Sequence, residues 1–182
     1  RRLAGRKLYD VKDIDFANYE EGIYVGYRFF CTKAKKAILY PFGYGLSYTS
    51  FSFSNMKVIP GENGWTVSVD VRNKGSVAGK DVVQIYVKAP HRKLDKPVLE
   101  LKGFAKTPLL APGESCTVSV EISRENLASF DESNSSWLLE KGKYKIIAAS
   151  DALHPECSRG ICIREEETRR VENLFAADPL FL

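Results

Sequence analysis

The feature that most constrains the fold is a two-residue hydrophobic alternation that recurs along the chain between turn signals. The clearest runs are WTVSVDVR at 65–72 and CTVSVEI at 116–122. Successive side chains of a β-strand point to opposite faces of the sheet, so each run predicts a strand with one buried face. Roughly seven such strands with turn signals between them, and no amphipathic helix of useful length, predict a mainly β, antiparallel β-sandwich.

The other segments of this sandwich are predicted from composition and turn signals. Further strands are expected in ranges rich in β-branched or aromatic residues, at 51–54, 80–88, 98–110, 137–139, 144–149 and 161–163. The range 80–88 is apolar on both faces and should be a central strand, those at 137–139 and 144–149 should share the last sheet, and 161–163 should be an edge. The alternation slips at Asn55-Met56, which predicts a β-bulge. A tight turn is expected at 111–114, and Ser123 should cap a short helical turn that ends near Phe130.

The predicted core follows from the inward-facing positions of these strands. It comprises Phe53, Trp65, Val67, Val69, Val71, Val83, Ile85, Val87, Val118, Val120, Ile122, Tyr144 and Ile146.

The segments on either side of the sandwich are less regular. Residues 1–18 are polar and charged and are expected to be extended, whereas the aromatic run at 19–30 predicts a strand entered through Gly22. The tail at 164–182 opens with a charged run, has partly helical spacing and ends in three apolar residues. We expect this apolar end to dock on this chain, on a second copy in a homo-oligomer, or on another domain.

The stretch YPFGYGLSYTSF at 40–51 places large aromatic side chains among glycines and a proline. Glycine lets another backbone approach closely, and proline fixes one φ angle. We interpret such an aromatic, stiffened loop as a docking element between two bodies, with an ordinary turn beside the core as the alternative. The candidate interdomain or substrate-entrance contacts are Tyr40, Phe42, Tyr44 and Tyr48.

Two motifs connect this stretch to a known family. The sequence PFGYGLSYT at 41–49, preceded by YEEGIYVGYRFF at 19–30, resembles the end of the second domain of glycoside hydrolase family 3, the β-glucosidase type. The sandwich is similar to the fibronectin type III-like domain that follows in many members, through VSVDVRNKGSVAGKDVVQIYVKAP (67–90), LELKGFAKTPLLAPGES (99–115), NLASFD (126–131) and WLLEKGKYKIIAAS (137–150). After Ser150 the sequence departs from the polar, cysteine-free hairpin expected there.

The resemblance implies a domain division. Residues 1–50 would be the terminal segment of the family's C-terminal α/β domain with a linker, 51–163 the fibronectin type III-like sandwich, and 164–182 a tail or linker. Some relatives carry their domains in a swapped order, in which case the tail would lead into more protein. We expect the chain to be a piece of a larger protein whose remaining domains are its partners.

The resemblance also implies what chemistry this chain lacks. Retaining glycosidases use two carboxyl groups about 5–5.5 Å apart. The resemblance implies that the nucleophilic aspartate lies on the family's barrel domain and the acid/base glutamate in an earlier part of the second domain, and neither motif is present here. No residue here is therefore expected to be catalytic, and the acidic clusters at 20–21, 131–132 and 165–167 should be solvated. The implied parent hydrolyses terminal β-D-glucosyl residues of oligosaccharides or aryl glycosides, and this chain is its structural, non-catalytic portion.

Two functions of other classes stay open. One is a module that binds carbohydrate or a cell surface through an exposed aromatic row, for which the candidates are Tyr86, Phe104 and Trp137. The other is a purely structural adhesion-type domain, which leaves the aromatic stretch at 40–51 unexplained.

Charge and cysteine usage exclude several further classes. The net charge of +4 is interleaved along the chain, so nucleic acid binding is not expected, and no apolar run approaches 18 residues, so no membrane span is expected. Neither a metal nor a cofactor is expected, because the cysteines and histidines show no metal-ligand spacing. These residues are Cys31, Cys116, Cys157, Cys162, His91 and His154. Scattered cysteines favour a reducing compartment such as the cytoplasm over the periplasm or secretion, although a Cys157–Cys162 disulfide stays open.

Overall fold

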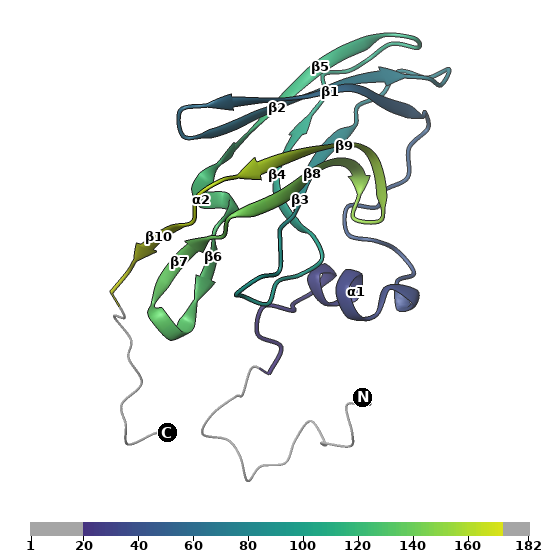
Figure 1. Cartoon of the computed structure of the whole chain (residues 1–182). Helices are drawn as coiled ribbons and strands as arrows, with labels where there is room; N and C mark the ends of the chain where they lie inside the picture. Colours follow the sequence, from purple (N-terminus) through teal and green to yellow (C-terminus); the bar gives the residue numbers. More distant parts are fainter. Residues whose placement is uncertain (1–19, 173–182) are drawn as a thin grey trace, which may run out of the picture.

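The computed structural model describes residues 20–172 and has two facing β-sheets with a short helix beneath one of them (Figure 1). The helical elements of this described part are α1 (Tyr27–Lys33), η1 (Lys35–Ala37), α2 (Arg124–Leu127) and η2 (Glu132–Asn134). Its strands are β1 (Phe51–Gly61), β2 (Gly64–Asn73), β3 (Val82–Lys88), β4 (Glu100–Lys106), β5 (Ser115–Ser123), β6 (Ser129–Asp131), β7 (Ser136–Leu139), β8 (Gly142–Asp151), β9 (His154–Ile163) and β10 (Glu167–Arg170).

The two large sheets form the predicted sandwich. Their strand orders are β1-β2-β5 and β4-β3-β8-β9, and neighbouring strands are antiparallel. The apolar faces meet in one core that contains the predicted residues, except that Trp65 is only partly buried at its edge. The prediction of a mainly β, antiparallel sandwich is therefore confirmed.

The predicted bulge lies where the alternation slips. The β1–β2 register shifts between Ser54 and Lys57, and Asn55 takes a positive φ of 50°. Without the extra residue, Phe53 and Met56 would point to opposite faces, because they are three positions apart. The bulge turns both side chains into the core, where each is buried.

Strand β3 is central, as its two apolar faces predict. It pairs with β4 on one side and β8 on the other. Val83, Ile85 and Val87 face the sandwich core, whereas Tyr86 belongs to a second apolar cluster on the outer face of the sheet. That outer face is covered by α1, whose Cys31 is buried in the same cluster.

The strand predicted at 19–30 is wrong, because this region contains a turn followed by α1. Gly26 has a φ of 58°, which ends the extended conformation directly before the helix. Tyr27 and Cys31 are four residues apart and so lie on one helical face, which packs on the sheet. Burial of this helical face on the apolar outer surface of the sheet outweighs the preference of aromatic residues for strands.

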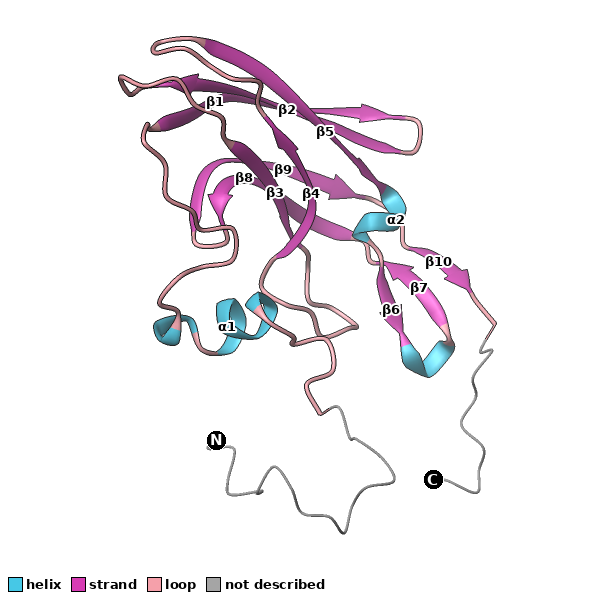
Figure 2. Ribbon diagram, turned by 180° about the vertical axis from the view of Figure 1, so that it is seen from behind, coloured by secondary structure: helices cyan, strands magenta, loops and turns pink. Residues whose placement is uncertain are grey.

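The region around the small third sheet differs from two predictions. Strand β7 does not join the last large sheet but lies between β6 and β10, at an end of the sandwich away from α1 (Figures 1 and 2). Helix α2 has the predicted Ser123 cap but ends at Leu127, because Phe130 instead pairs with Trp137 in the β6–β7 ladder. In the tail, residues 167–170 form β10, which pairs with β7, whereas the apolar residues with partly helical spacing follow from 171, and 173–182 lie outside the described part.

The final hairpin is longer than predicted, because β9 runs from His154 to Ile163 and forms the edge of the four-stranded sheet. Cys157 and Cys162 both lie on this strand and both are free thiols. Five positions along a strand separate them by roughly 16 Å and put them on opposite faces, beyond disulfide reach. A Cys157–Cys162 disulfide is therefore excluded.

Two predictions lie outside the described residues. They are the extended conformation of residues 1–18 and the docking of the apolar end at 180–182. In the described part of the chain, no helix is long and apolar enough to cross a membrane.

Candidate functional site

The candidate site is the aromatic loop, residues 40–48, which lies on the outer face of the four-stranded sheet next to α1. The loop is attached through its backbone, since the N–H of Ala152 donates a hydrogen bond of 2.9 Å to the carbonyl oxygen of Phe42. The N–H of Tyr44 donates to the carbonyl oxygen of Pro41 at 3.0 Å, which closes a tight turn. The loop conformation is thus set by main-chain contacts, and the aromatic side chains are free to project.

Gly43 is the residue that lets the loop lie so close to the sheet. Its φ is 87°, a conformation that side-chain-bearing residues rarely adopt, and a Cβ there would lie 2.2 Å from Nε2 of Gln84. Gln84 cannot easily move, because Nε2 donates to the Ser150 carbonyl and Oε1 accepts from the Tyr86 hydroxyl. A Cβ on Gly45 would meet no atom within 4 Å, and its φ is not positive, so only the first glycine of the pair is required here.

Helix α1 supports the loop from the side. The ring of Tyr27 stacks on Phe42 with centroids 4.8 Å apart and meets Tyr86 edge-on at 6.1 Å. Its hydroxyl oxygen accepts a hydrogen bond of 2.8 Å from the N–H of Leu101 at the start of β4. Tyr27 therefore joins the loop, the helix and the sheet into one body.

All four predicted contact residues are exposed. Tyr48 is 97% exposed, Tyr40 73%, and Phe42 and Tyr44 about half. Tyr40 and Tyr44 lie against each other with centroids 5.2 Å apart. Leu39 and Leu46, in and beside the same stretch, are 88% and 90% exposed. Large apolar side chains exposed this densely in one stretch are typical of an interaction site.

An open apolar groove borders this surface. It has a volume of about 490 Å³ and lies between α1 and the aromatic loop, lined by Gly26, Tyr27, Phe30, Cys31, Ala37, Ile38, Leu39, Tyr40 and Phe42. A second hollow, near Asn73, is lined by Ser52, Arg72, Asn73, Lys74 and Gly113. Neither hollow has a carboxylate in its lining, so neither offers the paired acids that glycoside hydrolysis requires.

Several acidic groups of the described residues lie beside basic side chains or are exposed, whereas Asp81 is half-buried without such a partner and burial raises its pKa. Glu100 pairs with Arg28 and Lys102, and Asp151 lies 2.7 Å from the His154 ring. The acidic clusters at 20–21 and 165–167 are exposed, with Glu166 and Glu167 in ion pairs. Among residues 20–172 no group of three or more histidine, cysteine or carboxylate side chains could hold a metal ion.

The aromatic row considered for carbohydrate binding is not present. Tyr86 is 1% exposed and lies beneath α1, so this candidate is wrong. Phe104 is exposed on β4, whereas Trp137 lies on β7 of the small sheet beside Phe130. The two remaining aromatics therefore belong to different sheets and form no common platform.

Residues that position the site were missed by sequence reasoning. Tyr24 and Thr32 hold the segment that carries α1 by hydrogen bonds to the β3–β4 loop, and Gln84 lies against Gly43 of the aromatic loop. Tyr24 and Gln84 lie within the motifs that carry the resemblance, but neither residue type nor local pattern indicates these contacts, and Thr32 lies in no quoted motif. Only the close approach of Gly43 to the side chain of Gln84 on β3 shows why a buried glutamine lies there.

The Tyr24 hydroxyl donates a hydrogen bond of 2.7 Å to Oδ2 of Asp95, which joins the start of the described chain to the loop between β3 and β4. This hydrogen bond, followed by burial, raises the pKa of Tyr24 to about 12. The same hydrogen bond lowers the pKa of Asp95. The contact is therefore stable while tyrosine is protonated and aspartate is ionised.

This contact is expected to make stability depend on pH at both ends of the range. Because the folded-state pKa of Tyr24 is raised, its contribution is present below about pH 10 and is lost as the pH rises toward 12. Because the pKa of Asp95 is lowered, its contribution is lost as the pH falls below about 4. The free energies of urea unfolding of the wild-type chain and of Tyr24→Phe should differ at neutral pH and become equal at the acid and alkaline extremes. A constant difference up to pH 12 would contradict this assignment.

Comparisons with known proteins agree with this geometry. Residues 81–152 match the fibronectin type III-like domain family. The chain is 43% identical over 150 residues to a β-glucosidase of Ruminococcus albus, and 45% identical over 154 residues to β-glucosidase A of Butyrivibrio fibrisolvens. These alignments cover 80% and 73% of this chain but only 16% and 19% of the relatives.

Solved structures give the same result. The chain superposes on β-glucosidase 3B of Thermotoga neapolitana, determined in complex with α-D-glucose, with a TM-score of 0.80 and 41% identity, covering 84% of this chain and 21% of that one. For the GH3 β-glucosidase of Bifidobacterium adolescentis the TM-score is 0.74 and the identity 32%, covering 79% and 21%. The chain thus spans about a fifth of the length of the curated relatives and structures that it matches.

Proposed function

We propose that this chain, whose fibronectin type III-like domain matches that of family 3 β-glucosidases, is a non-catalytic portion that stabilises the catalytic domains of such a hydrolase. The observation that carries the proposal is the exposed aromatic loop held rigidly on the outer face of the sandwich. Burying an aromatic side chain is worth roughly 1.5–3 kcal/mol, so this surface could supply much of a stable domain contact.

The parent enzyme is proposed to hydrolyse terminal β-D-glucosyl residues of oligosaccharides or aryl glycosides. The names of the relatives support this substrate class, and their length supports further domains that carry the two carboxylates of a retaining mechanism. The absence of an acidic cleft from the two hollows of the described part supports a structural role for this chain.

The domain division is proposed as follows. Residues 51–163 form the sandwich, residues 1–50 end the preceding α/β domain and link it to the sandwich, and residues 164–182 form a tail or linker. The hydrogen bonds of Tyr24 to the β3–β4 loop, of Tyr27 to β4 and of Phe42 to the turn between β8 and β9 support the view that the link is rigid.

A chimera tests the proposal. When this chain replaces the matching region of the Thermotoga neapolitana enzyme, the chimera should hydrolyse an aryl β-glucoside, whereas this chain alone should not. Replacing Tyr40, Tyr44 and Tyr48 together with serine should lower the melting temperature and activity of the chimera, because each loses roughly 1.5–3 kcal/mol of burial. The same triple variant should leave the isolated chain unchanged, because all three side chains are exposed in it.

Phe104→Ser is the matched control, since Phe104 is an exposed aromatic on β4 outside the aromatic loop. It should change the stability of the chimera by less than about 0.5 kcal/mol. Turnover by the isolated chain at enzyme-like rates, or a chimera that is indifferent to the triple variant, would refute the proposal. Retardation of the isolated chain on soluble glucans would instead support a carbohydrate-binding module.

A further inference from the structure

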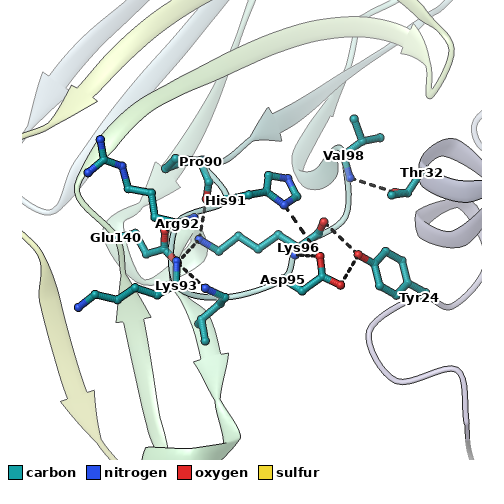
Figure 3. A network of polar contacts seen from close by, with 11 residues as sticks. Tyr24, Thr32, Pro90, His91, Arg92, Lys93, Asp95, Lys96, Val98 and Glu140 are labelled. Carbon is teal, nitrogen blue, oxygen red and sulfur yellow. Dashed lines mark hydrogen bonds and ion pairs between the residues drawn. The ribbon is translucent and has the colours of Figure 1, made fainter.

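The loop between β3 and β4, residues 89–99, is built around one buried carboxylate. Glu140 is 1% exposed and follows β7 directly. Its Oε1 accepts hydrogen bonds from the N–H groups of Lys93 and Leu94 at 3.1 and 2.9 Å, and its Oε2 accepts one from Arg92 at 3.1 Å (Figure 3). Three consecutive main-chain donors therefore converge on one side chain, which fixes the path of the loop.

Lys96 neutralises this carboxylate from within the same loop. It is 2% exposed, its Nζ lies 3.1 Å from Oε1 of Glu140, and it donates to the Pro90 carbonyl at 3.0 Å. Burial raises the pKa of Glu140, but the main-chain donors and Lys96 outweigh burial, so the pKa lies below its usual value. Glu140 therefore stays ionised at neutral pH, and Lys96 ties the two ends of the 90–96 segment together through the Pro90 carbonyl.

The opposite side of this loop receives the segment that carries α1. The Tyr24 hydroxyl lies 2.7 Å from Oδ2 of Asp95 and 3.3 Å from the carbonyl oxygen of Lys96. The N–H of Val98 donates to the Thr32 hydroxyl at 3.0 Å (Figure 3). The groups that hold the helix segment are the Asp95 carboxylate, the Lys96 carbonyl and the Val98 N–H, and all three belong to the loop that Glu140 and Lys96 position.

A path of contacts continues from this loop to the aromatic loop. Tyr24 and Thr32 flank Tyr27 in sequence, and Tyr27 stacks on Phe42. We propose that the buried Glu140–Lys96 pair is a positioning element that fixes the β3–β4 loop so that α1, and with it the aromatic loop, occupies one place on the sheet. The role of this position of α1 in a parent enzyme rests on the proposed function. The claim that the pair positions α1 within this chain does not depend on it.

A general role in stability makes a different prediction. A buried ion pair often contributes little net stability, but removal of one partner leaves the other charge buried and unpaired. If the pair only stabilised the sandwich, its loss would affect all regions equally through global unfolding. If it positions α1, the helix should separate from the sheet in molecules whose core is still folded.

Cys31 provides the reporter for this difference, because it is buried where α1 covers the sheet. The experiment uses the full chain with Cys116→Ala, Cys157→Ala and Cys162→Ser, so that Cys31 is the one remaining thiol. The rate at which a thiol reagent labels Cys31 in native buffer measures opening of α1, and urea unfolding followed by tryptophan fluorescence measures the core.

Lys96→Met should raise the Cys31 labelling rate roughly tenfold or more beyond the change expected from global unfolding. Lys96→Arg, which keeps the charge, should restore most of the protection. Lys93→Met is the matched control on the same loop, because its partner Glu166 is at the surface, and it should change the rate by less than about twofold.

Glu140→Gln gives a second, milder test, since it keeps an acceptor oxygen but removes the charge, and it is used if Lys96→Met does not fold. Labelling that is unchanged, or that rises only in proportion to global unfolding, would overturn the proposal. Both measurements use this chain alone, so their outcome is independent of the chimera that tests the proposed function.

Discussion

Replacing Gly43 with alanine is expected to destabilise the docked form of the aromatic loop by about 3 kcal/mol, from φ strain and loss of buried hydrogen bonds. The new methyl group would lie 2.2 Å from Nε2 of Gln84, at a φ of 87°. The protein can respond by moving Gln84, which breaks hydrogen bonds to Ser150 and Tyr86, or by releasing the loop. Either response removes the aromatic surface from its position.

The amide of Ala152 reports this change directly, because it donates to the Phe42 carbonyl only while the loop is docked. Hydrogen exchange at this amide should be slow in the wild-type chain and roughly a hundredfold faster in Gly43→Ala, if the opening free energy falls by about 3 kcal/mol. Gly45→Ala is the matched control, because space around Gly45 is open and its φ is not positive. Similar exchange in both variants would mean that the close approach to Gln84 does not hold the loop.

Replacing Asn73 with alanine is expected to lower the free energy of unfolding by about 3 kcal/mol, since it leaves buried partners unpaired. Asn73 is fully buried, and its Nδ2 donates to the carbonyls of Val77 and Leu110 at 2.8 and 3.0 Å. Its Oδ1 accepts from the Thr49 hydroxyl at 2.6 Å and from the N–H of Gly75 at 3.0 Å. One side chain thus joins the end of the aromatic stretch to two turns of the sandwich.

Urea unfolding of Asn73→Ala measures this loss. Asn134→Ala is the control, because Asn134 is exposed and makes one hydrogen bond, to Asp131. The free energy of unfolding of this control should lie within about 0.5 kcal/mol of the wild-type value. A loss of less than about 1 kcal/mol in Asn73→Ala would show that water replaces the amide, and that Asn73 does not organise the turns.

The sandwich strands were predictable because each one carries its own periodicity. Along β2 and β5, every second side chain enters the core, and this requirement is written into the local sequence. The bulge at Asn55 and the turn before β5 were found for the same reason. The error at α1 has the opposite cause, because its helical conformation depends on the outer face of a sheet built from residues far along the chain.

The candidate site divides in the same way. Its exposed aromatics could be identified from their concentration in one stretch, but their confirmation as interdomain contacts awaits the chimera. Gln84, Tyr24 and Asp95 could not be identified, because each acts through one partner more than 60 residues away or on a different strand. A local sequence pattern carries no information about contacts between residues so far apart in the chain.

The amino-acid sequence by itself determined the β-sandwich, its core and the presence of an unusual aromatic loop, because alternation and glycine placement are local properties. Only the tertiary structure decided that residues 27–33 form a helix, that Gly43 must lie on Gln84, and that Glu140 and Lys96 hold the β3–β4 loop. The physical reason is that these features depend on contacts between segments distant in sequence, where burial and hydrogen bonding outweigh local propensity.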